Sequence, residues 1–190
     1  MAASSVTTAN LIQGPGTLYS GNYGATEPTD TAVNTTPATS AWTDCGGTQG
    51  GAKFTLTQTF SELEVDQIVE VPARRLTKRE YMIETNLAEP TLENLVLTTN
   101  NTSAPASGAG YKSLDLDAAD SATQLTYRAF ILDGYAPGSF RRRLILRKGL
   151  STSNPENEFK KDGQTLIPAK LEGHFVSSSV KSLHIVDQTS

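Results

Sequence analysis

The clearest alternation of apolar and polar positions in this chain lies between residues 54 and 71. An apolar residue at every second position predicts an extended β-strand, which Pro72 should end. The apolar set occupies even positions up to Phe60 and odd positions from Leu63 onward. Because successive side chains of a strand point to opposite faces, this change of phase predicts a bulge or a bend at residues 59–61.

The polar positions beyond this change carry an acidic row. Glu62, Glu64, Asp66 and Glu70 occupy even positions and should share one face of the same strand, roughly 6.5–7 Å apart. A catalytic carboxylate pair needs a pocket in which the two carboxyl groups have different pKa values, and a flat row does not supply one. A calcium site needs oxygens that converge on one point, whereas these side chains all point the same way. A solvated strand face is its simplest interpretation.

A second strand and a helix follow. Residues 76–87 resume the alternation. Pro90 suits the first position of a helix, and Leu92, Leu95 and Val96 then recur at helical spacing. Further strands are predicted at residues 17–19, 42–45, 125–132, 140–148, 165–176 and 181–186. The chain is therefore expected to be mainly β, with one flanking α-helix packed on a sheet.

The long connections between these elements are polar and without period. Residues 1–16 should form an N-terminal arm, because a Gly-Pro-Gly breaker separates them from the first strand. Residues 20–41 and 98–113 are longer than the loops inside a compact domain usually are. We expect these two loops to be functional or to be ordered by a partner. The 190 residues fit one domain with such extensions.

Composition narrows the class of protein. Hydrophobic residues make up 37% of the chain and aromatic residues 7%, which is typical of a β-rich domain with polar loops. A net charge of −4 disfavours a basic nucleic-acid binder. A single cysteine allows no disulfide within the chain. The first ten residues lack the features of a signal peptide and no apolar run reaches membrane-spanning length, so we expect a soluble protein made in the cytoplasm.

No complete catalytic, cofactor or metal signature occurs in the sequence. The glycine-rich residues 46–53 precede Phe54, where a phosphate-binding loop would have Ser or Thr. His174 and His184 lack metal-site spacing with Cys45, and neither histidine has a candidate nucleophile nearby. We therefore expect no enzymatic activity, no cofactor and no metal.

A basic cluster lies in the predicted strand 140–148: Arg141, Arg142, Arg143, Arg147 and Lys148. Arginine clusters can grip phosphate, so binding of nucleic acid stays open as a hypothesis. Strand alternation, however, separates Arg142 from Arg141 and Arg143, and no aromatic stacking platform accompanies them. Pairing with neighbouring carboxylates is the favoured interpretation.

Several short motifs follow one another along the chain in a characteristic order. They are Gly16-Thr17-Leu18-Tyr19 with Gly24–Pro28, Trp42 with Cys45–Thr48 and Gly50-Gly51, Glu62–Asp66 ahead of Val71-Pro72, Leu87–Leu95, Tyr127-Arg128-Ala129, and Lys161-Asp162-Gly163. In this order they resemble the tail tube (major tail) proteins of long-tailed bacteriophages. The resemblance spans most of the chain.

The resemblance implies a β-sandwich or split barrel with a flanking helix, completed by ring oligomerisation. Six copies would close a ring, and the rings would stack into a hollow tube in the virion tail, assembled in the host cytoplasm. The implied partners are copies of the chain itself, a tape-measure protein, tail terminator and distal tail proteins, and DNA in transit without specific binding; no membrane is involved. The arm 1–16 and the loops 20–41 and 98–113 would then lie between subunits.

Within such a tube the acidic row is expected to line the lumen, because a basic wall would hold phosphates through counterion release. Repulsion by Glu62, Glu64, Asp66 and Glu70 would reach about 8–10 Å from the wall. By the same reasoning, the arginine cluster should lie at subunit contacts. The alternative is a monomeric or low-oligomer β-sandwich binding module, such as a capsid decoration or carbohydrate-binding protein, which would use an exposed Trp42 together with Tyr19, Tyr23 and Tyr135.

Overall fold

The computed structural model describes residues 6–117 and 125–189, and this part is mainly β with one α-helix, as predicted. The strands are β1 (Thr17–Asn22), β2 (Trp42–Asp44), β3 (Thr48–Val65), β4 (Ile68–Leu87), β5 (Ala106–Gly108), β6 (Tyr111–Ser113), β7 (Arg128–Tyr135), β8 (Arg141–Ser151), β9 (Ile167–Gly173) and β10 (Leu183–Asp187). The helix α1 spans Leu92–Thr98. Short 3₁₀ turns lie at Thr8–Asn10, Asp30–Ala32 and Pro137–Ser139.

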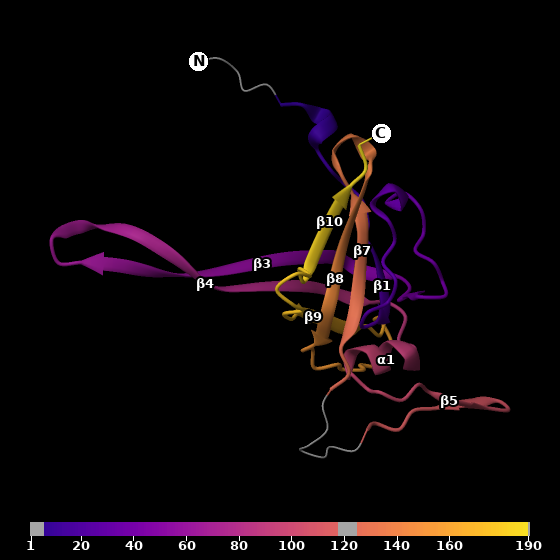
Figure 1. Ribbon diagram of the computed structural model, residues 1–190. Helices are drawn as coiled ribbons and strands as arrows, with labels where there is room; N and C mark the ends of the chain where they lie inside the picture. The colour runs from indigo at the N-terminus through magenta and orange to yellow at the C-terminus, as the bar shows by residue number, and fades with distance from the viewer. Residues whose placement is uncertain (1–5, 118–124, 190) are drawn as a thin grey trace.

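One antiparallel sheet organises the molecule. Its strand order is β2-β1-β7-β8-β9-β4-β3, and β10 also pairs with β8. Residues 142–146 of β8 pair with β10, whereas residues 149–151 of the same strand pair with β9. Figure 1 shows that β3 and β4 cross the direction of β7, β8 and β10. A sheet that turns at one strand packs its two parts across each other around a shared core, in the manner of a sandwich.

The main core lies between these two parts of the sheet. It consists of Leu18, Cys45, Ile83, Leu87, Leu97, Phe130, Leu132, Leu144, Leu146, Ile167, Ala169 and Leu171. Where β8 turns from one part to the other, Gly149 lies opposite Gly173. A Cβ atom at Gly149 would lie 2.7 Å from Cε2 of Phe130, so the close approach of this aromatic ring requires glycine.

The helix α1 begins later than predicted. Thr91 is the N-cap, and its side chain accepts a hydrogen bond from the backbone N–H of Asn94 at 3.2 Å. Pro90 therefore precedes the cap rather than occupying the first helical position. The buried side chain of Asn94 also donates to the carbonyl of Cys45 at 3.0 Å, which fixes the helix to the connection between β2 and β3.

The prediction of one strand from 54 to 71 is wrong. The chain turns back at Asp66-Gln67, so that β3 and β4 form a long antiparallel hairpin. The apolar alternation continues across the turn without a glycine, which is why the sequence pattern concealed it. Pro72 lies inside β4 and does not end a strand, because a strand with an unpaired outer edge tolerates a residue without an N–H.

An irregularity does lie at residues 59–61, but it is not a bulge of the strand that was predicted to carry it. The register between β3 and β4 shifts between Thr59 and Phe60, and the extra residue, Thr77, is on β4. Because β3 runs on without an extra residue, its apolar positions change face after Phe60. The hydroxyl of Thr77 donates to the carbonyl of Thr59 at 3.0 Å. A second shift, next to Gly50 and Gly51, explains the glycine-rich stretch: both glycines have φ near +81°, a conformation that other residues rarely adopt.

The long polar segments differ from one another in structure. Residues 23–41 fold back onto the outer face of β7 and β8, where Trp42 is only 2% exposed and donates from Nε1 to the carbonyl of Thr26 at 2.9 Å. Residues 98–113 contain the small β5–β6 hairpin. Of the arm, residues 1–5 lie outside the described part, and the remainder leads away from the body with Leu11 exposed (Figure 1).

Candidate functional site

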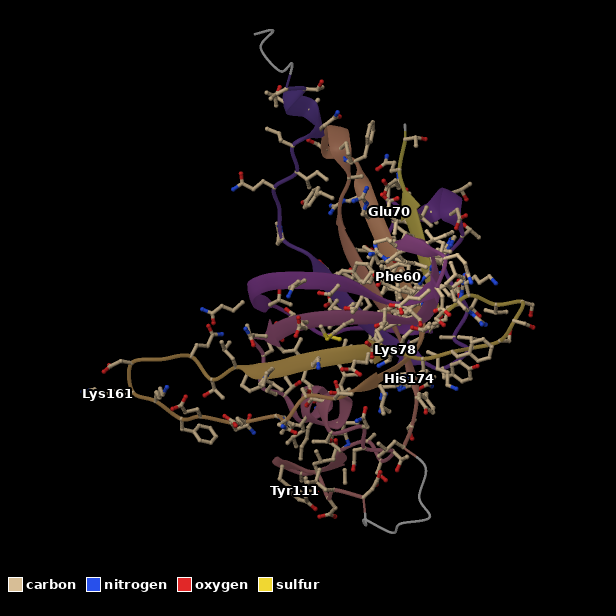
Figure 2. The ribbon with its side chains drawn as sticks, turned by 90° about the vertical axis from the view of Figure 1, so that its left-hand side faces the viewer. Phe60, Glu70, Lys78, Tyr111, Lys161 and His174 are labelled. Carbon is tan, nitrogen blue, oxygen red and sulfur yellow. The ribbon has the colours of Figure 1, made fainter. Side chains whose placement is uncertain are left out.

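The most distinctive surface is the β3–β4 hairpin. Its base belongs to the body, since Ile83 and Leu87 are buried in the core and β9 pairs with β4 from Met82 to Leu87. Beyond this base the two strands leave the body, with about 30 Å of ribbon between Leu56 and Val65 at 3.3 Å per residue (Figure 1). Figure 2 views the molecule from the side of the hairpin's tip.

One face of the hairpin is a continuation of the core. Phe54 lies opposite Ile83 near the base, and the pairs Leu56–Tyr81 and Phe60–Leu76 follow on the same face further out. Leu56, Phe60 and Leu76 are 45%, 51% and 38% exposed. We call Leu56, Phe60, Leu76 and Tyr81 the apolar stripe. The stripe has the pattern of a buried surface. Tyr81 packs against the core, but in the described part of the chain nothing covers the outer members Leu56, Phe60 and Leu76.

The tip of the hairpin is also apolar. Its exposed side chains are Leu63, Val65, Ile68, Val69 and Val71, and Val69 is fully accessible to solvent. Leu63 and Val65 occupy odd positions of β3, so they face away from the apolar stripe, and the hairpin exposes apolar side chains on both of its faces. Exposed apolar surface of this extent is rare in monomeric proteins and usually marks an interaction site.

The four carboxylates of the acidic row all lie near this tip, but not in one row on one strand. Glu62 and Glu64 share a face of β3, Asp66 is in the turn, and Glu70 is on the returning strand β4. Glu62 accepts two hydrogen bonds from Arg74, at 2.7 and 3.0 Å. Among the described residues, Glu64 has no hydrogen bond or ion pair, and it is exposed.

The returning strand carries a basic group that sequence reasoning missed: Arg74, Arg75, Lys78 and Arg79. Arg74 shares the face of Glu62, and Arg79 lies opposite Gln58 on that same face. Arg75 lies opposite Ser61 on the other face. Four cations in six residues were visible in the sequence. Their position beside the acidic residues was not, because it depends on the turn at residues 66–67.

The arginine cluster of β8 is used inside the subunit. Arg143 is 2% exposed and forms two bonds to Asp133, at 2.6 and 2.7 Å. Arg142 donates to both carboxylate oxygens of Asp187 at 2.6 Å, and Arg147 donates to Glu27 at 2.5 and 2.9 Å. These carboxylates raise the pKa of Arg142 and of Arg147, and Arg142 lowers the pKa of Asp187.

Burial removes Arg143 from the candidate subunit contacts, because its guanidinium is enclosed within its own chain. Arg141 is the most exposed of the four and stacks over the ring of Tyr135 at 4.8 Å. A contact role for Arg141, Arg142 and Arg147 stays a prediction. The pairing of Arg142, Arg143 and Arg147 with carboxylates agrees with the sequence interpretation.

The remaining chemical candidates lie apart. Burial raises the pKa of the Cys45 thiol to about 11. Burial also lowers the pKa of His174, whose ring packs edge-on against that of Tyr127. Nε2 of His184 lies 2.9 Å from a carboxylate oxygen of Asp30. Across residues 6–117 and 125–189, no group of three or more His, Cys, Asp or Glu side chains is placed to hold a metal ion. No helix in these ranges is long and apolar enough to cross a membrane.

Comparison with known proteins adds no further assignment. No protein-family model matches the chain, and no curated protein matches it significantly. The geometry of the hairpin is therefore the principal observation that bears on function.

Proposed function

We propose that this chain is the structural subunit of a phage tail tube, in which hexameric rings stack into a hollow tube. The projecting β3–β4 hairpin carries the proposal. It exposes an apolar face that continues the core, and beyond its base no strand among the described residues pairs with the outer edges of β3 and β4. Natural monomers blunt or cover such edges, so a chain that retains them is suited to completion by other copies of itself.

The energy available from covering the hairpin is substantial. Its eight exposed apolar side chains are Leu56, Phe60, Leu63, Val65, Ile68, Val69, Val71 and Leu76. Complete burial of one such side chain contributes about 1.5–3 kcal/mol, and roughly half of each is already removed from water. Covering all eight would therefore contribute on the order of 6–12 kcal/mol, which is comparable with the roughly 4–15 kcal/mol that association costs.

The resemblance supplies the rest of the proposal. In the virion tail the tube would enclose a tape-measure protein, would contact tail terminator and distal tail proteins at its ends, and would conduct DNA without binding it. Residues 54–80 contain five carboxylates and four cations, a net charge of −1. Uncompensated carboxylates are concentrated at the tip, so we place any repulsive part of the lumen wall at Asp66 and Glu70.

The alternative of a small binding module loses its main support. Trp42 was expected to be an exposed aromatic anchor, but it is buried between the outer face of the sheet and residues 23–41. Tyr23 is still 48% exposed, but its ring lies near the ammonium group of Lys148 rather than in an aromatic platform.

Light scattering and negative-stain microscopy of the purified protein test the proposal. We expect rings or tubes that form above a threshold concentration. Phe60→Ser should raise that threshold, because it removes the most exposed side chain of the apolar stripe. Phe159→Ser is the matched control, since Phe159 is 89% exposed but lies outside the hairpin. Discrete monomers at every concentration, or equal effects of the two substitutions, would refute the proposal.

A further inference from the structure

A small polar pocket lies on the outer face of the body, beside the segment 23–41. The strands β1, β7 and β8 run side by side beneath it (Figure 1). Its volume is about 120 Å³, which is room for several water molecules or for one small ion. Its polar lining includes Thr17, Tyr19, Asn34, Thr36, Asp133 and Arg141. A lining of hydroxyl, amide and charged groups favours a polar or charged ligand.

Strand pairing brings the charged groups of the pocket together. Thr17 lies opposite Asp133, and Asp133 lies opposite Arg143, so these three residues form one row across the sheet. Arg141 comes two residues before Arg143 and therefore shares its face of β8. It lies opposite Tyr135 on β7. The position of each group thus follows from the register of three paired strands.

The acidic group of the pocket is already compensated, whereas its cation is not. Asp133 accepts two hydrogen bonds from Arg143, at 2.6 and 2.7 Å. Within the described residues, the guanidinium of Arg141 has no carboxylate and no hydrogen-bond partner. It stacks over the ring of Tyr135, with 4.8 Å between Cζ and the ring centre. The pocket therefore carries one uncompensated positive charge.

Hydroxyl and amide groups lie around this charge. Four lining side chains have no hydrogen-bond partner among residues 6–117 and 125–189: Thr17, Tyr19, Asn34 and Thr36. Burial, together with the carboxylates of Asp44 and Asp133, raises the pKa of Tyr19, so its hydroxyl stays protonated and can donate. These groups belong to β1 and to the covering segment, and can therefore reach a ligand from more than one side.

We propose that this pocket binds a phosphate-type oxyanion, held by the guanidinium of Arg141 and by the hydroxyl groups of Thr17 and Tyr19. Arginine suits phosphate because its planar guanidinium donates two parallel hydrogen bonds. Stacking on Tyr135 uses the face of the guanidinium and leaves the N–H groups at its edge free. A tetrahedral anion is favoured over a carboxylate, since donors on several sides can bind more than two oxygens.

The inference goes beyond the proposed function and does not depend on ring formation, because all of these residues belong to one chain. Three arginines of β8, Arg142, Arg143 and Arg147, are paired with carboxylates of the same chain. Arg141 is the arginine of this strand that is left for a ligand. The phosphate can be inorganic or the terminal group of a monoester, since both present the same oxygens.

A phosphorus NMR titration of inorganic phosphate, at constant ionic strength, tests the proposal with free or assembled subunits. We expect one saturable site per chain, with a dissociation constant on the order of 1 mM, because the pocket is open to solvent and makes few contacts. Arg141→Gln should weaken binding about tenfold or more, since hydrogen bonds from a charged group are lost. Arg142→Gln is the matched control. Arg142 lies on the opposite face of β8 and is paired with Asp187, so its loss should leave phosphate binding unchanged.

Tyr19→Phe separates the pocket from a general effect of charge. The substitution removes one hydroxyl and keeps the ring, so it should weaken binding about two- to fivefold without changing the net charge. The fluorescence of Trp42, which is buried on the same face, checks that each variant is folded. Sulfate has the shape and charge of phosphate and should compete for the site, whereas acetate should compete poorly.

The outcomes decide between the possible ligands. No saturable binding up to about ten times the expected constant, equal effects of Arg141→Gln and Arg142→Gln, or equal competition by acetate would overturn the proposal. Displacement by phenyl phosphate would show that a monoester enters the pocket, and its failure would restrict the site to the inorganic anion; both results support the site. Duplex DNA that displaced phosphate as effectively as phenyl phosphate would assign Arg141 to nucleic acid instead, and would also overturn the proposal.

Discussion

The buried ion pair between Arg143 and Asp133 should be a major determinant of stability. The guanidinium donates to both oxygens of Asp133 and also to the carbonyls of Ala32 and Thr35, at 3.2 and 2.7 Å. It thereby ties residues 23–41 to the outer face of the sheet. Arg143→Met keeps most of the apolar volume of the side chain but leaves a poorly solvated carboxylate and two carbonyls without their donor.

Removing one partner of a buried pair costs about 3–5 kcal/mol, because the remaining charge loses its compensation. Arg142→Met is the matched control. It lies on the adjacent position of β8 and also pairs with an aspartate, Asp187, but both side chains of that pair are about one-third exposed. An exposed pair contributes about 0.2–1 kcal/mol, so the control should change the free energy of unfolding far less.

Urea unfolding followed by tryptophan fluorescence measures both variants. Trp42 is the single tryptophan of the chain, and it is buried in the cluster beneath residues 23–41, so its emission reports on this region. A double variant, Arg143→Met with Asp133→Leu, should recover part of the loss, because it removes the stranded charge. A loss below about 1 kcal/mol for Arg143→Met, or no recovery in the double variant, would contradict this reasoning.

Three further predictions concern single positions. Gly149→Ala should destabilise the fold by about 1–3 kcal/mol in urea unfolding, because the added methyl group would clash with the ring of Phe130 on β7. Gly134→Ala is the control and should change stability little, because no atom lies within 4 Å of the added methyl group. The Cys45 thiol, with its pKa raised to about 11, should react slowly with a disulfide reagent at pH 8 and quickly in urea; fast native labelling would contradict its burial. Arg142 lowers the pKa of Asp187, so their ion pair should stabilise the fold at pH values above 3.8, the ordinary pKa of aspartate. This stabilisation should be lost as the pH falls below 3.8. Asp187→Asn should therefore weaken the pH dependence of stability in acid unfolding curves.

The sequence predicted the type of most elements because apolar alternation depends only on local geometry. The strands at residues 128–135 and 141–151 and the helix at 92–98 all occur near their expected positions. The turn at Asp66-Gln67 was missed because neither residue is a glycine and the apolar alternation continues past them. Local pattern therefore identified the extended stretch but not the point at which it reverses.

The candidate site depended on long-range pairing, which the sequence does not display. Glu62 and Arg74 are twelve residues apart and become neighbours only through the hairpin. The burial of Trp42 depends on residues 23–41 folding back, which in turn depends on Arg143 more than one hundred residues away. Sequence reasoning could therefore name charged and aromatic candidates, but it could not say which of them compensate one another.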